Sequence, residues 1–238
     1  MSTIKSARTG VVANLTIDRA AEGNMLTIDM LGELSAAVRA AGATDAKVIV
    51  LRANGPDFCR GRAPGGAPSP TAMKVRANVC EPILDAYDAM SNARQPIVGV
   101  VQGAALGFGC AIGSVCDITI AHDTARFKLP EMEKDLPPTL AMSAVMPRVP
   151  RKVLAWMVYS MDELDATTAR QVGIVSKVAP SAQVESEVAK LLATMTARTP
   201  EALVAVKDFL RSAPHMEPRG MADYGANLLA AVLSSAGK

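Results

Sequence analysis

The stretch PIVGVVQGAALGFGCAIGSVCD, residues 96–117, decides how this chain folds. It begins with a β-branched run at residues 97–101, becomes rich in glycine at Gly103, Gly107 and Gly109, and continues in small apolar residues. This order predicts a buried strand, a tight turn and the first turns of a buried helix. Glycines allow positive φ angles and close approach of another group, and free N–H groups at a helix start favour negative charge. The stretch therefore predicts a site that stabilises an anion or a developing oxyanion.

The composition is that of an ordinary globular protein. The chain has 238 residues, 50% of them hydrophobic and 20% charged, which is enough for a sizeable core in at most two domains. Its net charge of +2 is too small to predict a nucleic-acid surface. No apolar run approaches the roughly 18–20 residues that span a bilayer, so we expect no membrane association. The first ten residues, MSTIKSARTG, lack an apolar signal core, so we expect a cytoplasmic protein.

The cysteines and histidines predict no metal site. Four cysteines, Cys59, Cys80, Cys110 and Cys116, show no metal-ligand spacing, and the chain has two histidines. We therefore interpret the cysteines as free thiols, most of them buried.

The remaining sequence alternates strands and helices. Apolar and polar patterns predict strands at residues 11–17, 47–53, 97–101, 118–121, 126–129 and 174–178. Helical spacing predicts helices at residues 25–41, 71–90, 140–146, 152–160 and 166–171. A glycine- and proline-rich segment up to Pro70 predicts a mobile loop. This order favours an α/β layer with crossover helices.

The C-terminal region is predicted to be mostly helical from residue 182 onward. Thr199 before Pro200 fits an N-cap followed by proline at the first helical position. The alanine- and leucine-rich faces of this region suit contacts between subunits. We expect a core at residues 1–180 that carries the site and a helical oligomerisation region at residues 181–238.

Three separated motifs together resemble the enoyl-CoA hydratase/isomerase family, the crotonase family. They are FCRGR at 58–62, PIVGVVQGAALGFGCAI at 96–112 and CDITIAHDTARFKLPE at 116–131. The resemblance runs from about Val11 to about Lys207. It implies an α/β fold built as a spiral of ββα units with a helical C-terminal region, assembled as a homotrimer or homohexamer. It also implies an acyl-CoA substrate, with no metal and no cofactor beyond the coenzyme A of the substrate.

The resemblance also implies which groups form the oxyanion site. The two main-chain N–H groups that hold the thioester oxygen in the family match Arg62 and Phe108. The side chain of Arg62 also suits the phosphates of coenzyme A, because a guanidinium group matches phosphate geometry. The residues expected around the substrate are Arg62, Ala63, Gly107, Gly109 and Ala111.

The carboxylates depart from the pattern of the family's hydratases. Those enzymes use two glutamates to activate water, and the first falls where this chain has Ala111, whose methyl group accepts no proton. The second is present as Glu131. A single glutamate at this second position suits isomerisation, because it shuttles one proton between two carbons. We therefore favour an isomerase, and the hydratase alternative requires Glu133 or Asp135 to replace the missing carboxylate.

Two alternatives come from other classes of protein. A dinucleotide-binding βαβ unit also places glycines after a strand, but residues 107–113, GFGCAIG, have three residues between the last two glycines where the GxGxxG fingerprint has two. A non-catalytic relative that binds CoA esters, or only assembles into oligomers, is suggested by Ala111. The presence of Glu131 argues against this second alternative.

Overall fold

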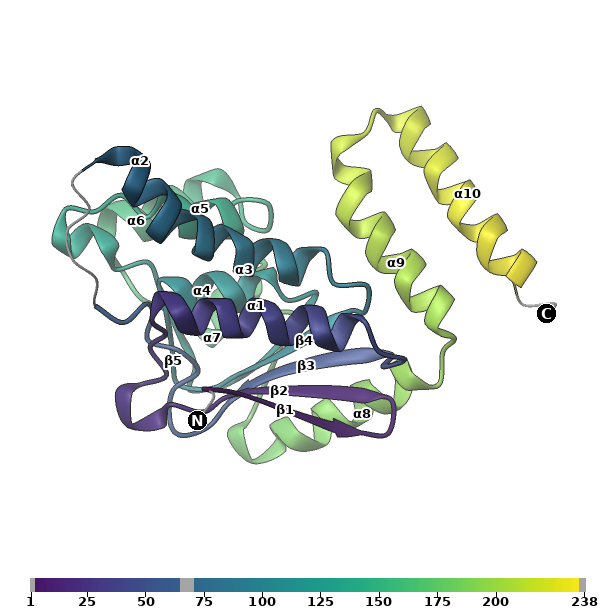
Figure 1. The fold of residues 1–238 in the computed structure, drawn as a ribbon, viewed down its shortest axis with the longest axis horizontal. Coiled ribbons are helices and arrows are strands. Elements are labelled where there is room, and N and C mark those ends of the chain that lie inside the picture. Colours follow the sequence, from purple (N-terminus) through teal and green to yellow (C-terminus); the bar gives the residue numbers. More distant parts are fainter. Residues whose placement is uncertain (1–2, 65–70, 236–238) are drawn as a thin grey trace.

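The computed structural model describes residues 3–64 and 71–235 and contains two β-sheets (Figure 1). The larger sheet has the order β1-β2-β3-β4-β6-β9, and all neighbouring pairs are parallel except β1 and β2. Its strands are β1 (Ile4–Thr9), β2 (Val12–Ile17), β3 (Val48–Ala53), β4 (Ile97–Val101), β6 (Ile118–His122) and β9 (Lys177–Ala179). The smaller sheet has the order β5-β7-β8, with β5 (Ala104–Leu106), β7 (Arg126–Lys128) and β8 (Leu164–Asp165). The loop expected before Pro70 falls largely outside the described residues.

Successive segments of the chain each contribute one strand to the larger sheet and then one short extended stretch to the smaller sheet. β4 leads into β5, and β6 leads into β7. After β3 the chain makes the same step, because Cys59 forms an isolated parallel bridge with Ala105 of β5. Arg62 forms another such bridge with Leu26. The chain therefore repeats a strand–strand–helix unit, as the family resemblance implies.

Helices cover both faces of the larger sheet. Figure 1 shows α1 and α3 above the sheet and α8 below it. The α-helices up to residue 196 are α1 (Ile28–Gly42), α2 (Ala72–Val75), α3 (Glu81–Ser91), α4 (Phe108–Val115), α5 (Thr139–Val145), α6 (Arg151–Ser160), α7 (Ala166–Val172) and α8 (Val184–Thr196). A π-helical turn at Arg76–Cys80 joins α2 to α3, so the helix predicted at residues 71–90 is continuous.

The pattern of buried residues explains why these elements form. Thr27 caps α1 by accepting a hydrogen bond from the N–H of Met30, and Leu31, Leu34 and Val38 follow at helical spacing on its buried face. β3 begins with four buried apolar residues because its sheet is covered on both sides. One side of the sheet faces the main core, and Val48, Val50, Val98 and Val100 pack instead with α8.

Three segments differ from the sequence-based expectations. Ile4–Thr9 forms a strand that the sequence did not reveal, because only Ile4 is buried and the segment shows no apolar alternation. The predicted tight turn between β4 and α4 contains the short strand β5, which pairs with β7. The last predicted strand, at residues 174–178, lies at Lys177–Ala179.

The last two helices, α9 (Pro200–Ser212) and α10 (Pro218–Ser235), form a hairpin that stands away from the sheets (Figure 1). The Thr199 side chain caps α9 by accepting a hydrogen bond from the N–H of Ala202, as predicted. The rings of Phe209 and Tyr224 stack between the two helices with centroids 6.3 Å apart. The division expected at residues 180 and 181 stays a prediction, and α8 on the far side of that boundary packs against the larger sheet.

A buried lysine attaches this hairpin to the rest of the chain. Within α9, all of whose residues are described, Lys207 alone is buried. Its ammonium group donates to the carbonyl oxygens of Met90 (3.2 Å) and Gln95 (3.0 Å), and it lies 2.9 Å from Asp117 Oδ2. Asp117 Oδ2 also accepts a hydrogen bond from the N–H of Ile97 at 2.7 Å. The ammonium group thus has three acceptors for its three protons.

Candidate active site

Two segments that are far apart in the sequence, residues 59–62 and 104–109, lie side by side. The N–H of Cys59 donates to the carbonyl of Ala104 at 3.0 Å, and the N–H of Leu106 donates to the carbonyl of Cys59 at 2.9 Å. A Cβ atom at Gly109 would lie 2.0 Å from the carbonyl oxygen of Cys59. Only glycine therefore allows α4 to begin this close to the neighbouring segment.

This arrangement brings the two expected oxyanion donors, Arg62 and Phe108, onto adjacent segments. Phe108 is the first residue of α4, and Gly107 before it has a φ of 51°, which suits glycine. The N–H of Gly107 donates to the carbonyl of Lys128 at 2.8 Å. The N–H groups of Arg62 and Phe108 make no main-chain hydrogen bond within the described residues. Phe108 lies at a helix start, where free N–H groups favour negative charge.

The smaller sheet positions Glu131 next to Gly107 and Phe108. Leu106 of β5 pairs with Lys128 of β7, and three residues later Glu131 starts a 3-10 turn, Glu131–Lys134. A Cβ atom at Gly107 would lie 2.7 Å from Glu131 Oε1. The carboxylate therefore lies against the glycine that precedes Phe108, beside the predicted oxyanion donors.

The environment of Glu131 favours its protonated form. Its Oε2 atom is buried and has no hydrogen-bond partner among the described residues. Burial raises the pKa of the Glu131 carboxyl above its ordinary value of 4.5. A carboxyl group with a raised pKa and no salt-bridge partner is typical of a catalytic acid or base.

The other two candidate carboxylates lie in different surroundings. Glu133 is exposed, and its Oε1 atom lies 2.5 Å from Lys128 Nζ. Asp135 is exposed and has a φ of 54° at the end of the 3-10 turn. Ala111, where the family's hydratases have a glutamate, is fully buried in the first turns of α4. Of the three carboxylates, only the half-buried Glu131 has a buried oxygen atom, Oε2, without a hydrogen-bond partner among the described residues.

The remaining predicted residues lie at the edge of this site. Arg62 is exposed, and its guanidinium group donates to the carbonyl of Ala63 at 3.4 Å. Ala63 is buried, and its N–H donates to the carbonyl of Leu26 at 2.8 Å. The side chain of Arg62 is therefore accessible to an anionic ligand.

Sequence reasoning missed Tyr87 of α3. Its ring stacks on Phe108 with centroids 5.6 Å apart and an interplanar angle of 17°. Burial, together with the nearby carboxylate of Glu131, raises the pKa of the Tyr87 hydroxyl. Nothing in the sequence separates this tyrosine from other residues of a predicted helix, because its role depends on which helix packs over α4.

The cysteines next to the site are buried thiols, as predicted for most of them. Burial raises the pKa values of Cys59 and Cys110 to about 12, so both stay neutral at neutral pH. Within residues 3–64 and 71–235, no group of three or more His, Cys, Asp or Glu residues is arranged to hold a metal ion. In the same part of the chain no helix has the length and apolar character needed to cross a membrane.

The family model for enoyl-CoA hydratase/isomerase matches residues 7–235. The chain therefore belongs to the enoyl-CoA hydratase/isomerase family, and the predicted family is confirmed.

Curated relatives agree with this assignment. The chain is 32% identical over 213 residues to the 2,3-dehydroadipyl-CoA hydratase of Escherichia coli (strain K12), covering 89% of this chain and 82% of the relative. It is 29% identical over 189 residues to the mitochondrial enoyl-CoA hydratase domain-containing protein 3 of Rattus norvegicus. That match covers 78% of this chain and 63% of the relative, so the chain spans less than two thirds of that protein. Because this relative is named as mitochondrial, the expected cytoplasmic location stays a prediction.

Solved structures show the same fold. Human enoyl-CoA hydratase domain-containing protein 3 superposes with a TM-score of 0.92 at 21% identity, covering 98% of this chain and 92% of that chain. An enoyl-CoA hydratase of Mycobacterium smegmatis also gives a TM-score of 0.92 at 21% identity, covering 97% and 91% of the two chains. The α/β crotonase fold predicted from the sequence is therefore confirmed.

We expect Gly109→Ala to destabilise the protein by about 1–3 kcal/mol, because its Cβ atom would overlap the carbonyl oxygen of Cys59. Urea unfolding followed by circular dichroism measures this change. The matched control is Gly32→Ala at an exposed position of α1, where a Cβ atom meets nothing within 4 Å. That change should stabilise the protein by about 0.5–1 kcal/mol. Equal effects of the two substitutions would contradict the proposed close contact.

Proposed function

We propose that this protein is an enzyme that isomerises the double bond of an enoyl-CoA thioester with Glu131 as its single catalytic carboxylate. The observation that carries this proposal is the half-buried carboxyl group of Glu131, whose buried Oε2 atom has no hydrogen-bond partner among the described residues and which lies against Gly107, next to Phe108. The position of the other glutamate of the family's hydratases is occupied by Ala111. One carboxylate is sufficient to move a proton between two carbons. Activation of a water molecule in the manner of the family's hydratases requires a second carboxylate.

The proposed reaction converts a 3-enoyl-CoA into a 2-enoyl-CoA. The N–H groups of Arg62 and Phe108 donate to the thioester oxygen, and Glu131 removes a proton from the α carbon. The electrons of the broken C–H bond form a dienolate whose negative charge rests on the thioester oxygen. Glu131 then returns the proton to the γ carbon, and the double bond moves next to the thioester. Each oxyanion donor typically contributes about 2.7–4 kcal/mol to stabilisation of the transition state.

The proposed substrate supplies the coenzyme A group, so the reaction includes no separate cofactor and no metal. The exposed guanidinium group of Arg62 suits the phosphates of that coenzyme A. This assignment is part of the proposal, and it predicts binding of saturated acyl-CoA thioesters, which resemble the substrate but do not react.

Hydration is the second candidate function, and the 2,3-dehydroadipyl-CoA hydratase relative favours it. It requires Glu133 or Asp135 to act with Glu131. The ion pair of Glu133 with Lys128 argues against this arrangement, and so does the exposure of Glu133 and Asp135. A non-catalytic protein that binds CoA esters is the third candidate, and it predicts binding without turnover.

We expect Glu131→Gln to lower kcat for isomerisation of 3-hexenoyl-CoA by roughly 10²- to 10⁴-fold, because the amide keeps the shape and removes the base. Glu133→Gln is the matched control, and it should leave kcat within about threefold because Glu133 is not the general base. The assay also tests hydration of crotonyl-CoA by the unmodified enzyme. Brisk hydration, with an equal loss on removing Glu133 or Asp135, would replace our proposal by the hydratase mechanism.

The raised pKa of Glu131 predicts the pH dependence of the reaction. The base is active when ionised, so kcat/KM should fall as the pH decreases through a pKa above 4.5. A pH profile of kcat/KM measures this acid limb. Burial favours the protonated carboxyl, so its contribution to folding stability is present at low pH and is lost as the pH rises through the raised pKa. An acid limb at or below 4.5 would contradict the assignment of Glu131 as a buried base.

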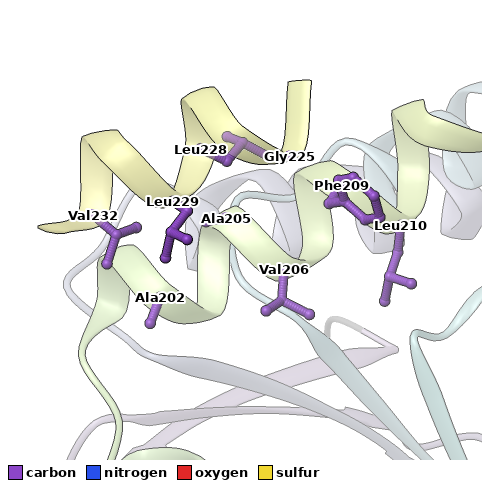
Figure 2. Close-up of a pocket in the computed structure, with 9 residues that line it drawn as sticks. All are labelled: Ala202, Ala205, Val206, Phe209, Leu210, Gly225, Leu228, Leu229 and Val232. Carbon is purple, nitrogen blue, oxygen red and sulfur yellow. The ribbon is translucent and has the colours of Figure 1, made fainter. Parts of the chain in front are cut away.

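We also propose that the protein assembles as a homotrimer or homohexamer through α9 and α10. An apolar groove of about 360 Å³ lies between these helices, and Figure 2 shows its lining side chains gathered in one patch. Among its lining residues, Val206, Leu210 and Leu229 are 60–62% exposed, and Leu233 of the same α10 helix is 66% exposed. Large exposed apolar patches of this kind are typical of protein–protein contacts.

We expect Leu229→Glu with Leu233→Glu to dissociate the assembly, because the change places two charges in an apolar contact. Light scattering should then detect particles of one 24.8 kDa chain, whereas the unmodified protein forms particles at least three times heavier. Asn227→Glu is the control, because it adds a charge at an exposed polar position of the same helix. An unmodified protein that is monomeric at micromolar concentration would overturn the proposal.

A further inference from the structure

A cavity of about 830 Å³ lies behind the candidate active site, where α3, α4 and α5 meet. It is lined by Leu84 and Tyr87 of α3, Ser114 and Val115 of α4, and Ser143 and Ala144 of α5. Asp117, Arg148, Arg211 and His215 are also part of its lining. Asp117 is paired with Lys207, and Arg211 with Asp208, so these charges are partly neutralised.

α4 connects the catalytic residues with this cavity. Ser114 and Val115 follow Ala111 by three and four residues, so the three side chains lie on one face of the helix. At about 1.5 Å per residue, the cavity wall begins roughly 5–6 Å farther along α4 than Ala111. An acyl chain that passes Glu131 and Ala111 in this direction points toward the cavity.

Tyr87 lies between the proposed substrate pocket beside Phe108 and the cavity between α3, α4 and α5. Its ring stacks on Phe108 at one side, and the same residue lines the cavity at the other. It is 7% exposed, so the ring is packed on nearly all sides. A chain that extends into the cavity displaces this ring from its contact with Phe108.

We propose that Tyr87 limits the acyl chain length by closing the substrate pocket against the cavity between α3, α4 and α5. The inference rests on the proposed function, because it assumes that an acyl-CoA thioester lies beside Glu131 and Phe108. It specifies the substrate class as thioesters of short acyl groups. A smaller side chain at position 87 opens the cavity to longer acyl groups.

Binding of two saturated, unreactive thioesters tests this inference without reference to the reaction type. Calorimetry measures the Kd of butyryl-CoA and of octanoyl-CoA for each protein. The unmodified protein should bind butyryl-CoA at least as tightly as octanoyl-CoA. Tyr87→Leu should tighten octanoyl-CoA binding by roughly tenfold or more relative to butyryl-CoA, since each methylene group that packs against the apolar part of the lining, Leu84, Val115 and Ala144, contributes to affinity.

Two further variants separate this role from a general loosening of the fold. Tyr87→Phe keeps the ring and should retain the ratio of the two Kd values. Tyr87→Leu combined with Ser143→Phe fills the opened cavity from α5 and should abolish the gain for octanoyl-CoA. Circular dichroism and thermal melting establish folding, and Tyr87→Met replaces Tyr87→Leu if the latter unfolds below the assay temperature.

The outcomes distinguish this inference from the proposed function. If the unmodified protein binds neither thioester, the proposed function fails and the inference fails with it. If it binds butyryl-CoA and Tyr87→Leu leaves the ratio of the Kd values unchanged, the inference alone is overturned. A gain for octanoyl-CoA that persists after Ser143→Phe also overturns it, because the added chain is then not in the cavity.

Discussion

The close contact between Gly109 and the carbonyl of Cys59 is the constraint on which the site depends. It allows the first turn of α4 to lie against residues 59–62, so two N–H groups from separate turns of the chain lie on adjacent segments. The smaller sheet holds this arrangement, because β5 pairs with Cys59 on one side and with β7 on the other. The same sheet that positions the two predicted oxyanion donors therefore also positions Glu131.

Glu131, the proposed catalytic group, illustrates how such a role conflicts with folding stability. An unpartnered carboxylate oxygen in a buried place is unfavourable, because no hydrogen bond replaces its interaction with water. The surrounding apolar core tolerates this group, and the cost appears as a raised pKa. A paired carboxylate such as Glu133 avoids the cost, because its Oε1 atom lies 2.5 Å from Lys128 Nζ and the side chain is exposed to water.

The α9–α10 hairpin is attached by a different kind of interaction. α9 presents a buried lysine to the core, and the hydrogen bonds of Lys207 require specific positions of Met90, Gln95 and Asp117. A buried ion pair contributes little net stability compared with apolar packing. Its directional bonds nevertheless define one position of α9 relative to the sheets. Asp117 follows α4 directly, so the hairpin is attached next to the C-terminal end of the helix that begins at Phe108.

The residues by themselves determined the strand–glycine–helix motif and the N-cap at Thr199, because glycine, proline and apolar spacing act locally. The resemblance of three sequence motifs to a known family indicated the family and the candidate residues Arg62, Phe108 and Glu131. It also showed that Ala111 replaces a carboxylate. Only the tertiary structure revealed β1 and β5, whose short segments carry no apolar alternation and form through pairing. It also placed Tyr87 over Phe108 and separated Glu131 from Glu133. Burial and partners depend on which elements pack together, and residues identical in type and close in sequence receive different roles for that reason.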